Sequence, residues 1–173
     1  MATASSVGLR NGSAAIRWYL LAFAVVLLDQ YTKGLASGAL DYGRPVEIFF
    51  WFDLTLHHNT GAAFSFLSDA GGWQRWFFVT IALLISVALV FWMRQLQAGE
   101  RLTAYGLALI VGGAIGNLID RVWLGKVIDF LQWHWQEWYW PAFNLADSAI
   151  TLGVILLLLD GLVSRRSAQE PGP

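Results

Sequence analysis

The chain has 173 residues, of which 57% are hydrophobic and 13% are charged, and its formal net charge is −1. Soluble domains have roughly 25% charged residues, so this composition, with a mean hydropathy of +0.52, indicates a membrane protein. The small net charge gives no reason to expect a nucleic-acid partner. The absence of cysteine excludes disulfides, thiolate metal sites, a cysteine nucleophile and lipid modification of the chain as a lipoprotein.

Four apolar segments approach the length of about 20 residues that spans a bilayer core. They predict transmembrane helices at about 16–36, 73–93, 102–119 and 143–163. The first follows a basic stretch, as in a signal peptide, but no convincing cleavage site follows it, so we expect an uncleaved helix. The tail at 167–173 should be disordered. The expected fold is therefore an α-helical integral membrane protein, a single domain over 1–173 with four transmembrane helices.

Basic residues predict the orientation of these helices. One side collects the amino terminus, the short turn at 94–101 and the carboxyl tail, with Arg10, Arg17, Arg94, Arg101, Arg165 and Arg166. The positive-inside rule makes this side cytoplasmic. The other side carries fewer basic residues, namely Lys33, Arg44, Arg75, Arg121 and Lys126.

The two outer connections, about 37–72 and 122–142, differ in pattern. In the first, Val46–Leu56 is rich in β-branched and aromatic residues, which predicts strands, and Asn59-Thr60-Gly61 predicts a turn. The second contains five tryptophans. Tryptophan favours the membrane–water interface, so we expect an interfacial segment or helix lying along the outer surface.

Polar residues inside membrane helices are costly, at about 2.5–3.5 kcal/mol per charge on insertion scales, and therefore need a reason. Three sets share a helix face by their spacing of three or four residues: Asp29 with Lys33, Asn117 with Asp120 and Arg121, and Asn144 with Asp147. Each set has a structural alternative. The first could be a neutralised pair, the second a supporting hydrogen-bond network, and the third a helix cap with a dipole-complementing acid.

Glycines precede the second of these sets. Gly112 and Gly116 are four residues apart in the third apolar segment. This small-residue spacing lets another helix approach closely.

Other chemistry is poorly supported. His57 and His58 are adjacent and His134 is alone, so no metal ligand spacing is present. Ser65 and Ser148 lack the surroundings of a serine nucleophile. We expect neither a metal nor a cofactor.

Five motifs occur in order along the chain: Asp29-Gln-Tyr-Thr-Lys33, Asn59-Thr-Gly-Ala-Ala-Phe-Ser-Phe66, Gly113-Ala-Ile-Gly-Asn-Leu-Ile-Asp-Arg121, Val127-Ile-Asp-Phe130 and Phe143-Asn-Leu-Ala-Asp-Ser148. Together they resemble the bacterial lipoprotein signal peptidase family, signal peptidase II. The resemblance implies an intramembrane aspartic endopeptidase of the bacterial inner membrane. Such enzymes remove the signal peptide from a diacylglyceryl-modified prolipoprotein, cleaving before the lipidated cysteine.

By motif, Asp129 and Asp147 match the family's catalytic dyad. The resemblance implies that the other characteristic positions shape the dyad's surroundings and the substrate groove; these are Asp29, Lys33, Asn59, Gly61, Asn117, Asp120, Arg121 and Asn144. It also implies a β-rich extracytoplasmic cradle, a surface helix, an active site near the periplasmic side, contact with membrane lipids and inhibition by globomycin. We expect a monomer. His57 and His58 stand in a variable region, which leaves substrate contacts of the loop open.

Two close carboxylates can activate a water because they share one proton, so that one acts as general base and the other as general acid. Two other functions compete. A small transporter or channel could relay protons through paired carboxylates, but no inverted repeat is visible. A non-catalytic assembly factor could use the acids only to pair with Arg121, Lys126 and Lys33.

Overall fold

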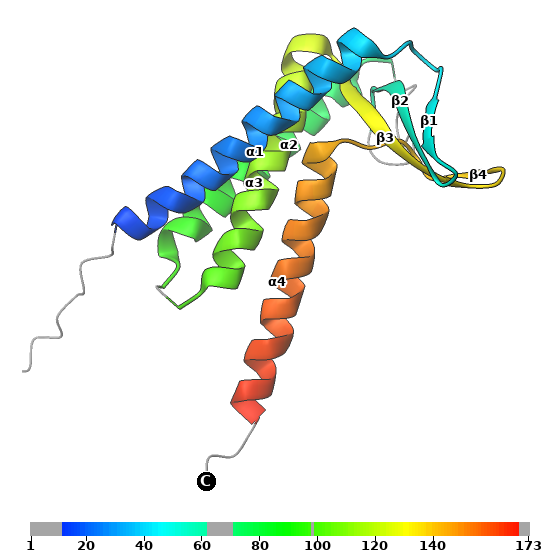
Figure 1. The fold of residues 1–173 in the computed structure, drawn as a ribbon. Helices are drawn as coiled ribbons and strands as arrows, with labels where there is room; N and C mark the ends of the chain where they lie inside the picture. The colour runs from blue at the N-terminus through cyan, green and yellow to red at the C-terminus, as the bar shows by residue number, and fades with distance from the viewer. Residues whose placement is uncertain (1–11, 62–70, 98, 170–173) are drawn as a thin grey trace, which may run out of the picture.

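The computed structural model describes residues 12–61, 71–97 and 99–169. Its helices and strands follow in the order α1 Gly12–Ala39, β1 Val46–Phe49, β2 Phe52–Asn59, α2 Trp73–Gln95, α3 Arg101–Leu124, β3 Val127–Trp135, β4 Trp138–Tyr139 and α4 Leu145–Gln169. The helices pack around α3, and the strands gather at one end of the helices (Figure 1).

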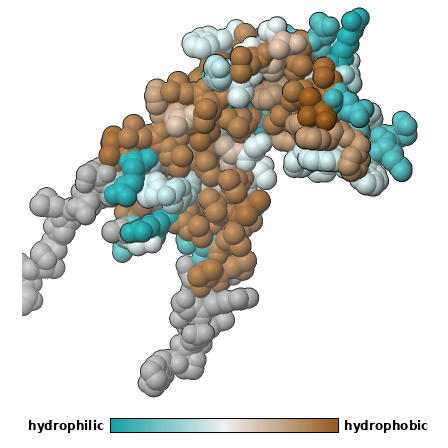
Figure 2. Space-filling model, in the orientation of Figure 1, coloured by the Kyte–Doolittle hydropathy of each residue, from teal (hydrophilic) through white to brown (hydrophobic). Residues whose placement is uncertain are grey.

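Three of the described helices are long and apolar enough to cross a membrane: α2, α3 and the 145–163 part of α4. Large apolar side chains of α4 point outward, among them Leu158 and Leu162, which are 63% and 60% exposed, and the surface along the helices is mostly hydrophobic (Figure 2). The described part of α1 does not meet the same criterion, and it carries Arg17, Asp29 and Lys33. The fourth span at 16–36 therefore stays a prediction.

Glycines of α3 allow its neighbours to come close. A Cβ at Gly112 would lie 2.7 Å from the carbonyl oxygen of Ala22 in α1, and one at Gly106 would lie 2.8 Å from the carbonyl oxygen of Gly153 in α4. A Cβ at Gly116 would lie 2.5 Å from Oδ2 of Asp29. The predicted close approach at Gly112 and Gly116 is thus confirmed, and the helix that approaches is α1.

The four strands form one antiparallel sheet in the order β1-β2-β3-β4. The strands predicted in Val46–Leu56 are present as β1 and β2. Because β2 pairs with β3, the two outer connections form one structure, with His57 opposite Asp129 in the register.

The helical alternative for the second connection is wrong. Residues 127–135 form β3, and 138–139 form β4. The physical reason is visible in the alternating sequence Leu131-Gln132-Trp133-His134-Trp135, whose period of two suits a strand. The backbone of β3 forms hydrogen bonds with its neighbours β2 and β4.

The two ends of the described chain lie away from the sheet. The start of α1 and the end of α4 are both at the end of the molecule away from the sheet (Figure 1). Helix α4 continues to Gln169, so the expected disordered tail at 167–173 begins as helix. The rest of that tail, Arg10 and residues 62–66 of the second motif lie outside the described residues.

Candidate active site

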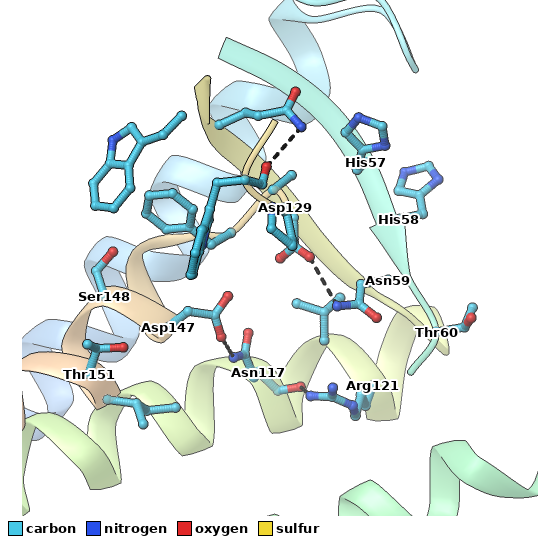
Figure 3. A pocket seen from close by; sticks show the side chains of 18 of the residues that line it. His57, His58, Asn59, Thr60, Asn117, Arg121, Asp129, Asp147, Ser148 and Thr151 are labelled. Atoms are coloured by element: carbon cyan, nitrogen blue, oxygen red, sulfur yellow. Dashed lines mark hydrogen bonds between the residues drawn. The ribbon is translucent and has the colours of Figure 1, made fainter. Parts of the chain in front are cut away.

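Asp129 and Asp147 line the same cavity from different elements. Asp129 stands on β3, and Asp147 in the first turn of α4. The cavity has a volume of about 1010 Å³, and its wall also contains Asn59, Asn117 and Arg121. In Figure 3 the two carboxylates point into one space between the sheet and α4. The structure therefore brings the two expected dyad residues together.

Asn144 is the residue that fixes Asp147. It immediately precedes α4, and its Oδ1 accepts the backbone N–H of Asp147 at 2.9 Å. In return, Oδ2 of Asp147 accepts the backbone N–H of Asn144 at 3.2 Å. This is a capping box, in which two backbone donors at a helix start are satisfied reciprocally. The predicted cap is confirmed, and it also orients the acid.

Asparagine amides hold both carboxylates. Asn144 donates through Nδ2 to Oδ1 of Asp129 at 2.7 Å, and Asn59 donates to Oδ2 of Asp129 at 3.3 Å. Asn117 donates through Nδ2 to Oδ1 of Asp147 at 2.8 Å. Asn144 thus contacts both acids, and each carboxylate has a defined orientation toward the cavity.

The surroundings favour a proton on the dyad. Burial, and then the charge of Asp147, raise the pKa of Asp129 to about 7, against the opposing effect of its hydrogen bonds to Asn59 and Asn144. Only 3% of Asp129 is exposed. Two like charges in a poorly solvated site cannot both ionise cheaply, so the pair is able to hold one proton near neutral pH.

A buried ion cluster lies behind the cavity wall. The ammonium nitrogen of Lys33 is 2.9 Å from Asp29 Oδ2, from Asp120 Oδ2 and from Asn117 Oδ1. Lys33 is 2% exposed, and Asp29 is fully buried. The three donor hydrogens of the ammonium are thereby matched to three acceptors. The pair predicted from the spacing of Asp29 and Lys33 exists, and it is part of a larger network.

This cluster connects elements that are distant in sequence. Asp29 Oδ1 accepts the backbone N–H of Ala146 in α4 at 3.0 Å, and Asp120 Oδ2 accepts the backbone N–H of Ile128 in β3 at 3.1 Å. Ile128 precedes Asp129, and Ala146 precedes Asp147. The cluster therefore fixes the backbone beside each dyad residue.

Arg121 ties the turn after β2 to α3. Its Nη2 donates to the carbonyl oxygen of Gly61 at 2.8 Å, and its guanidinium carbon lies 5.2 Å from the ring centre of Phe78. The N–H of Gly61 donates to Oδ1 of Asn59 at 2.9 Å. This contact leaves Nδ2 of Asn59 directed at Asp129. All eight predicted supporting residues thus belong to one connected region.

One member of the network was missed from the sequence. Gln30 donates through Nε2 to Asp120 Oδ1 at 2.9 Å, and the same nitrogen is 3.2 Å from Asp29 Oδ2 and from the carbonyl oxygen of Gly116. Gln30 carries no charge, and the cost of burying charge points only to Asp29 and Lys33 in the first apolar segment. The signal that could have found it is an amide beside Asp29 in an otherwise apolar helix.

The histidines have different neighbours. His134 is 3.2 Å from Asp53 in the sheet, whereas His58 contacts Lys126. Among residues 12–61, 71–97 and 99–169, no group of three histidine or acidic side chains is placed to hold a metal ion.

Comparison with known proteins identifies the family. A family model described as signal peptidase (SPase) II matches residues 21–163. The chain belongs to the signal peptidase II family. The lipoprotein signal peptidase of Ectopseudomonas mendocina is 52% identical over 155 residues, which cover 88% of this chain and 92% of that protein. That of Pseudomonas aeruginosa is 50% identical over 154 residues, covering 88% and 91%.

A solved structure agrees with the sequence comparison. The structure of a bacterial membrane enzyme at 2.3 Å resolution superposes with a TM-score of 0.79 and 32% identity, covering 94% of this chain and 95% of that one. Signal peptidase II is a protease, so the chain is a proteolytic enzyme. The family recognised from the five motifs is confirmed.

Proposed function

We propose that the protein is a membrane-embedded aspartic endopeptidase that removes the signal peptide from diacylglyceryl-modified prolipoproteins, cleaving before the lipidated cysteine. The observation that carries the proposal is that Asp129 and Asp147 line one cavity, each with its carboxylate oriented by asparagine amides. Membership of the signal peptidase II family supports the substrate class.

In the proposed mechanism the dyad holds one proton and one negative charge. The ionised aspartate takes a proton from a water in the cavity, and the resulting hydroxide attacks the peptide carbonyl carbon. The protonated aspartate gives its proton to the carbonyl oxygen, so no free charge develops. A proton then passes from the diol to the amide nitrogen, and the C–N bond breaks to give a carboxylic acid and an amine. The raised pKa of Asp129, at about 7, supports this protonation state.

The cavity offers two kinds of wall for such a substrate. Ile150, Leu152 and Ile155 of α4 form an apolar side, while residues of the sheet form a more polar side. We propose that the signal peptide and the diacylglyceryl chains lie against α4 and the surrounding membrane lipids. The sheet then forms the cradle that receives the chain leaving the membrane.

The proposed location is the bacterial inner membrane. In this arrangement 16–36 is the fourth span, both termini are cytoplasmic, the dyad is near the periplasmic side and the enzyme acts as a monomer. The start of α1 and the end of α4 lie away from the sheet (Figure 1). Arg94 and Arg101 border the turn between α2 and α3. These features support the orientation by the positive-inside rule.

The test is cleavage by the purified protein in lipid vesicles. A diacylglyceryl-modified prolipoprotein should be cut before its cysteine, and the same prolipoprotein without diacylglycerol should be cut far more slowly. Globomycin should inhibit both the cleavage and the binding of substrate. Proton flux across the vesicles without any cleavage would instead favour a transporter. An assembly factor would be favoured if the wild type showed no proteolysis and substitutions at Asp129 or Asp147 impaired folding or partner binding.

A further inference from the structure

His58 in the cavity wall contacts Lys126, and this pair, called the rim below, has no part in the mechanism above. Nζ of Lys126, which precedes β3, lies 3.0 Å from Nδ1 of His58 on β2. His58 and its neighbour His57 line the cavity that contains Asp129 and Asp147. In Figure 3 the two histidines lie across the cavity from Ser148 and Thr151 of α4.

The contact with Lys126 fixes the chemistry of His58. An ammonium group has only donors, so Nδ1 of His58 must accept, and the ring hydrogen is on Nε2. Burial, followed by the charges of Lys126 and His57, lowers the pKa of His58, which keeps the ring neutral at pH 7. The ring of Tyr42, also in the cavity wall, packs 4.8 Å from that of His58. The imidazole is thus held as a neutral donor beside a cation.

The charge of Lys126 is not neutralised by the part of the chain that the structure describes. Lys33, by contrast, is paired with Asp29 and Asp120. The described carboxylates form no ion pair with Lys126. The rim therefore presents a positive charge and a neighbouring N–H donor, a combination that binds an anionic oxygen group.

We infer that His58 and Lys126 form a subsite for a carboxylate side chain of the substrate, shortly after the lipidated cysteine. This inference rests on the proposed function. The apolar α4 wall suits the signal peptide, so the sheet side of the cavity is where the mature part of the substrate leaves. An aspartate or glutamate there meets the ammonium and the imidazole N–H, whereas a lysine meets like charge.

The experiment compares substrates that differ in one residue. Diacylglyceryl prolipoproteins with aspartate, asparagine or lysine at each of the first three positions after the cysteine are cleaved by the full-length protein in neutral phosphatidylcholine vesicles. At one position at least, kcat/KM should be about two- to fivefold higher for aspartate than for asparagine, the size expected of a solvent-accessible ion pair, and lower still for lysine. The preference should shrink at high salt.

Variants locate the preference. Lys126→Gln should bring the aspartate-to-asparagine ratio close to one, whereas Lys126→Arg should retain it. Arg44→Gln is the matched control, because Arg44 is another basic residue of the outer region, lies 3.8 Å from Asp41 and is 80% exposed; this variant should keep the wild-type ratio.

Three results would overturn the inference. One is an aspartate-to-asparagine ratio of one for the wild type at all three positions, a result that does not depend on the folding of any variant. Another is a wild-type preference that survives in Lys126→Gln. The third is a fall in kcat/KM of Lys126→Gln that is equal for all substrates and appears only when the vesicles contain anionic lipid. That result would assign the rim to a lipid phosphate. Failure to cleave even the asparagine substrates would contradict the proposed function itself, so the two failures are distinguishable.

Discussion

Asn144 and Asp147 hydrogen-bond each other twice at the start of α4, side chain to backbone in both directions, at 2.9 and 3.2 Å. The same Asn144 donates to Asp129 at 2.7 Å. One residue therefore caps a membrane helix and orients both acids of the dyad. These two roles use different atoms, since Oδ1 serves the cap and Nδ2 serves Asp129, so they can be separated by mutation.

Asn144→Ser separates them. Serine is as good an N-cap as asparagine, but its side chain is too short to replace Nδ2 at Asp129. Because Nδ2 also donates to Asn117 and to the carbonyl oxygen of Ile128, Asn144→Ser should lose some stability but keep the cap. Its kcat should fall about tenfold or more, because a hydrogen bond to a charged group contributes about 1.5–3 kcal/mol. Asn144→Ala should lose the cap as well, at about 0.5–2 kcal/mol. Denaturation and cleavage assays on both variants check this, and equal kcat in Asn144→Ser and wild type would contradict it.

The ion cluster behind the cavity is expected to be essential for folding. Lys33→Met leaves Asp29 and Asp120 buried without their cation, and breaking a buried pair in this way costs about 3–5 kcal/mol. Thermal unfolding in detergent should show a large loss of stability. Arg44→Ala removes a cation from an exposed pair with Asp41 and should cost less than about 1 kcal/mol. Similar effects of the two substitutions would show that the cluster is not structural.

The close approach between α1 and α3 can be tested by substituting Gly116. In Gly116→Ala the new Cβ would lie 2.5 Å from Oδ2 of Asp29, a carboxylate held in place by Lys33 and Ala146. We expect lower stability and lower activity together. Gly38→Ala in α1 has nothing within 4 Å of the added carbon, so it should be neutral or stabilise by up to about 1 kcal/mol. Unchanged activity in Gly116→Ala would mean that Asp29 is free to move.

Activity should fall as the pH rises above neutral. Burial and the charge of Asp147 raise the pKa of Asp129 to about 7, so raising the pH through this value removes the proton that the dyad shares. The rate kcat/KM should decrease about tenfold per pH unit beyond that point. A cleavage profile with a circular-dichroism control for folding measures this. A constant rate between about pH 6 and pH 9 would contradict the shared proton.

Stability should change at lower pH, between the ordinary pKa of an aspartate and the raised pKa of Asp129. Because the pKa of Asp129 is raised above the ordinary 3.8, the folded chain binds more protons than the unfolded chain between these values. The contribution of Asp129 to the free energy of unfolding is fully present at low pH and is lost as the pH rises through about 7. In Asp129→Asn this part of the pH dependence should be absent.

Much of the site could be predicted from local spacing. The three-residue spacing of Asn144 and Asp147 at the start of an apolar segment predicted both a cap and a shared face, and the four-residue spacing of Asp29 and Lys33 predicted a pair. Both rest on helix geometry, which a sequence encodes directly. The glycines of the third segment likewise predicted close packing before the partner helix was known.

Contacts between distant segments could not be predicted in this way. The pairing of β2 with β3 places Asn59 beside Asp129, yet these residues are 70 positions apart and no local pattern connects them. The tryptophans of the second connection favour an interfacial segment or helix, and they obscure the alternation that marks residues 127–135 as a strand. The contact of His58 with Lys126 depends on the same pairing.

The central claim is that Asp129 and Asp147 together activate the water. It is tested most directly by measuring cleavage of a diacylglyceryl prolipoprotein by Asp129→Asn and by Asp147→Asn, each purified in vesicles, with the exposed Asp41→Asn as control. Both dyad variants should insert, fold and bind globomycin or substrate but release no signal peptide, while Asp41→Asn should cleave like the wild type. Signal-peptide release at the wild-type rate by either dyad variant would contradict it.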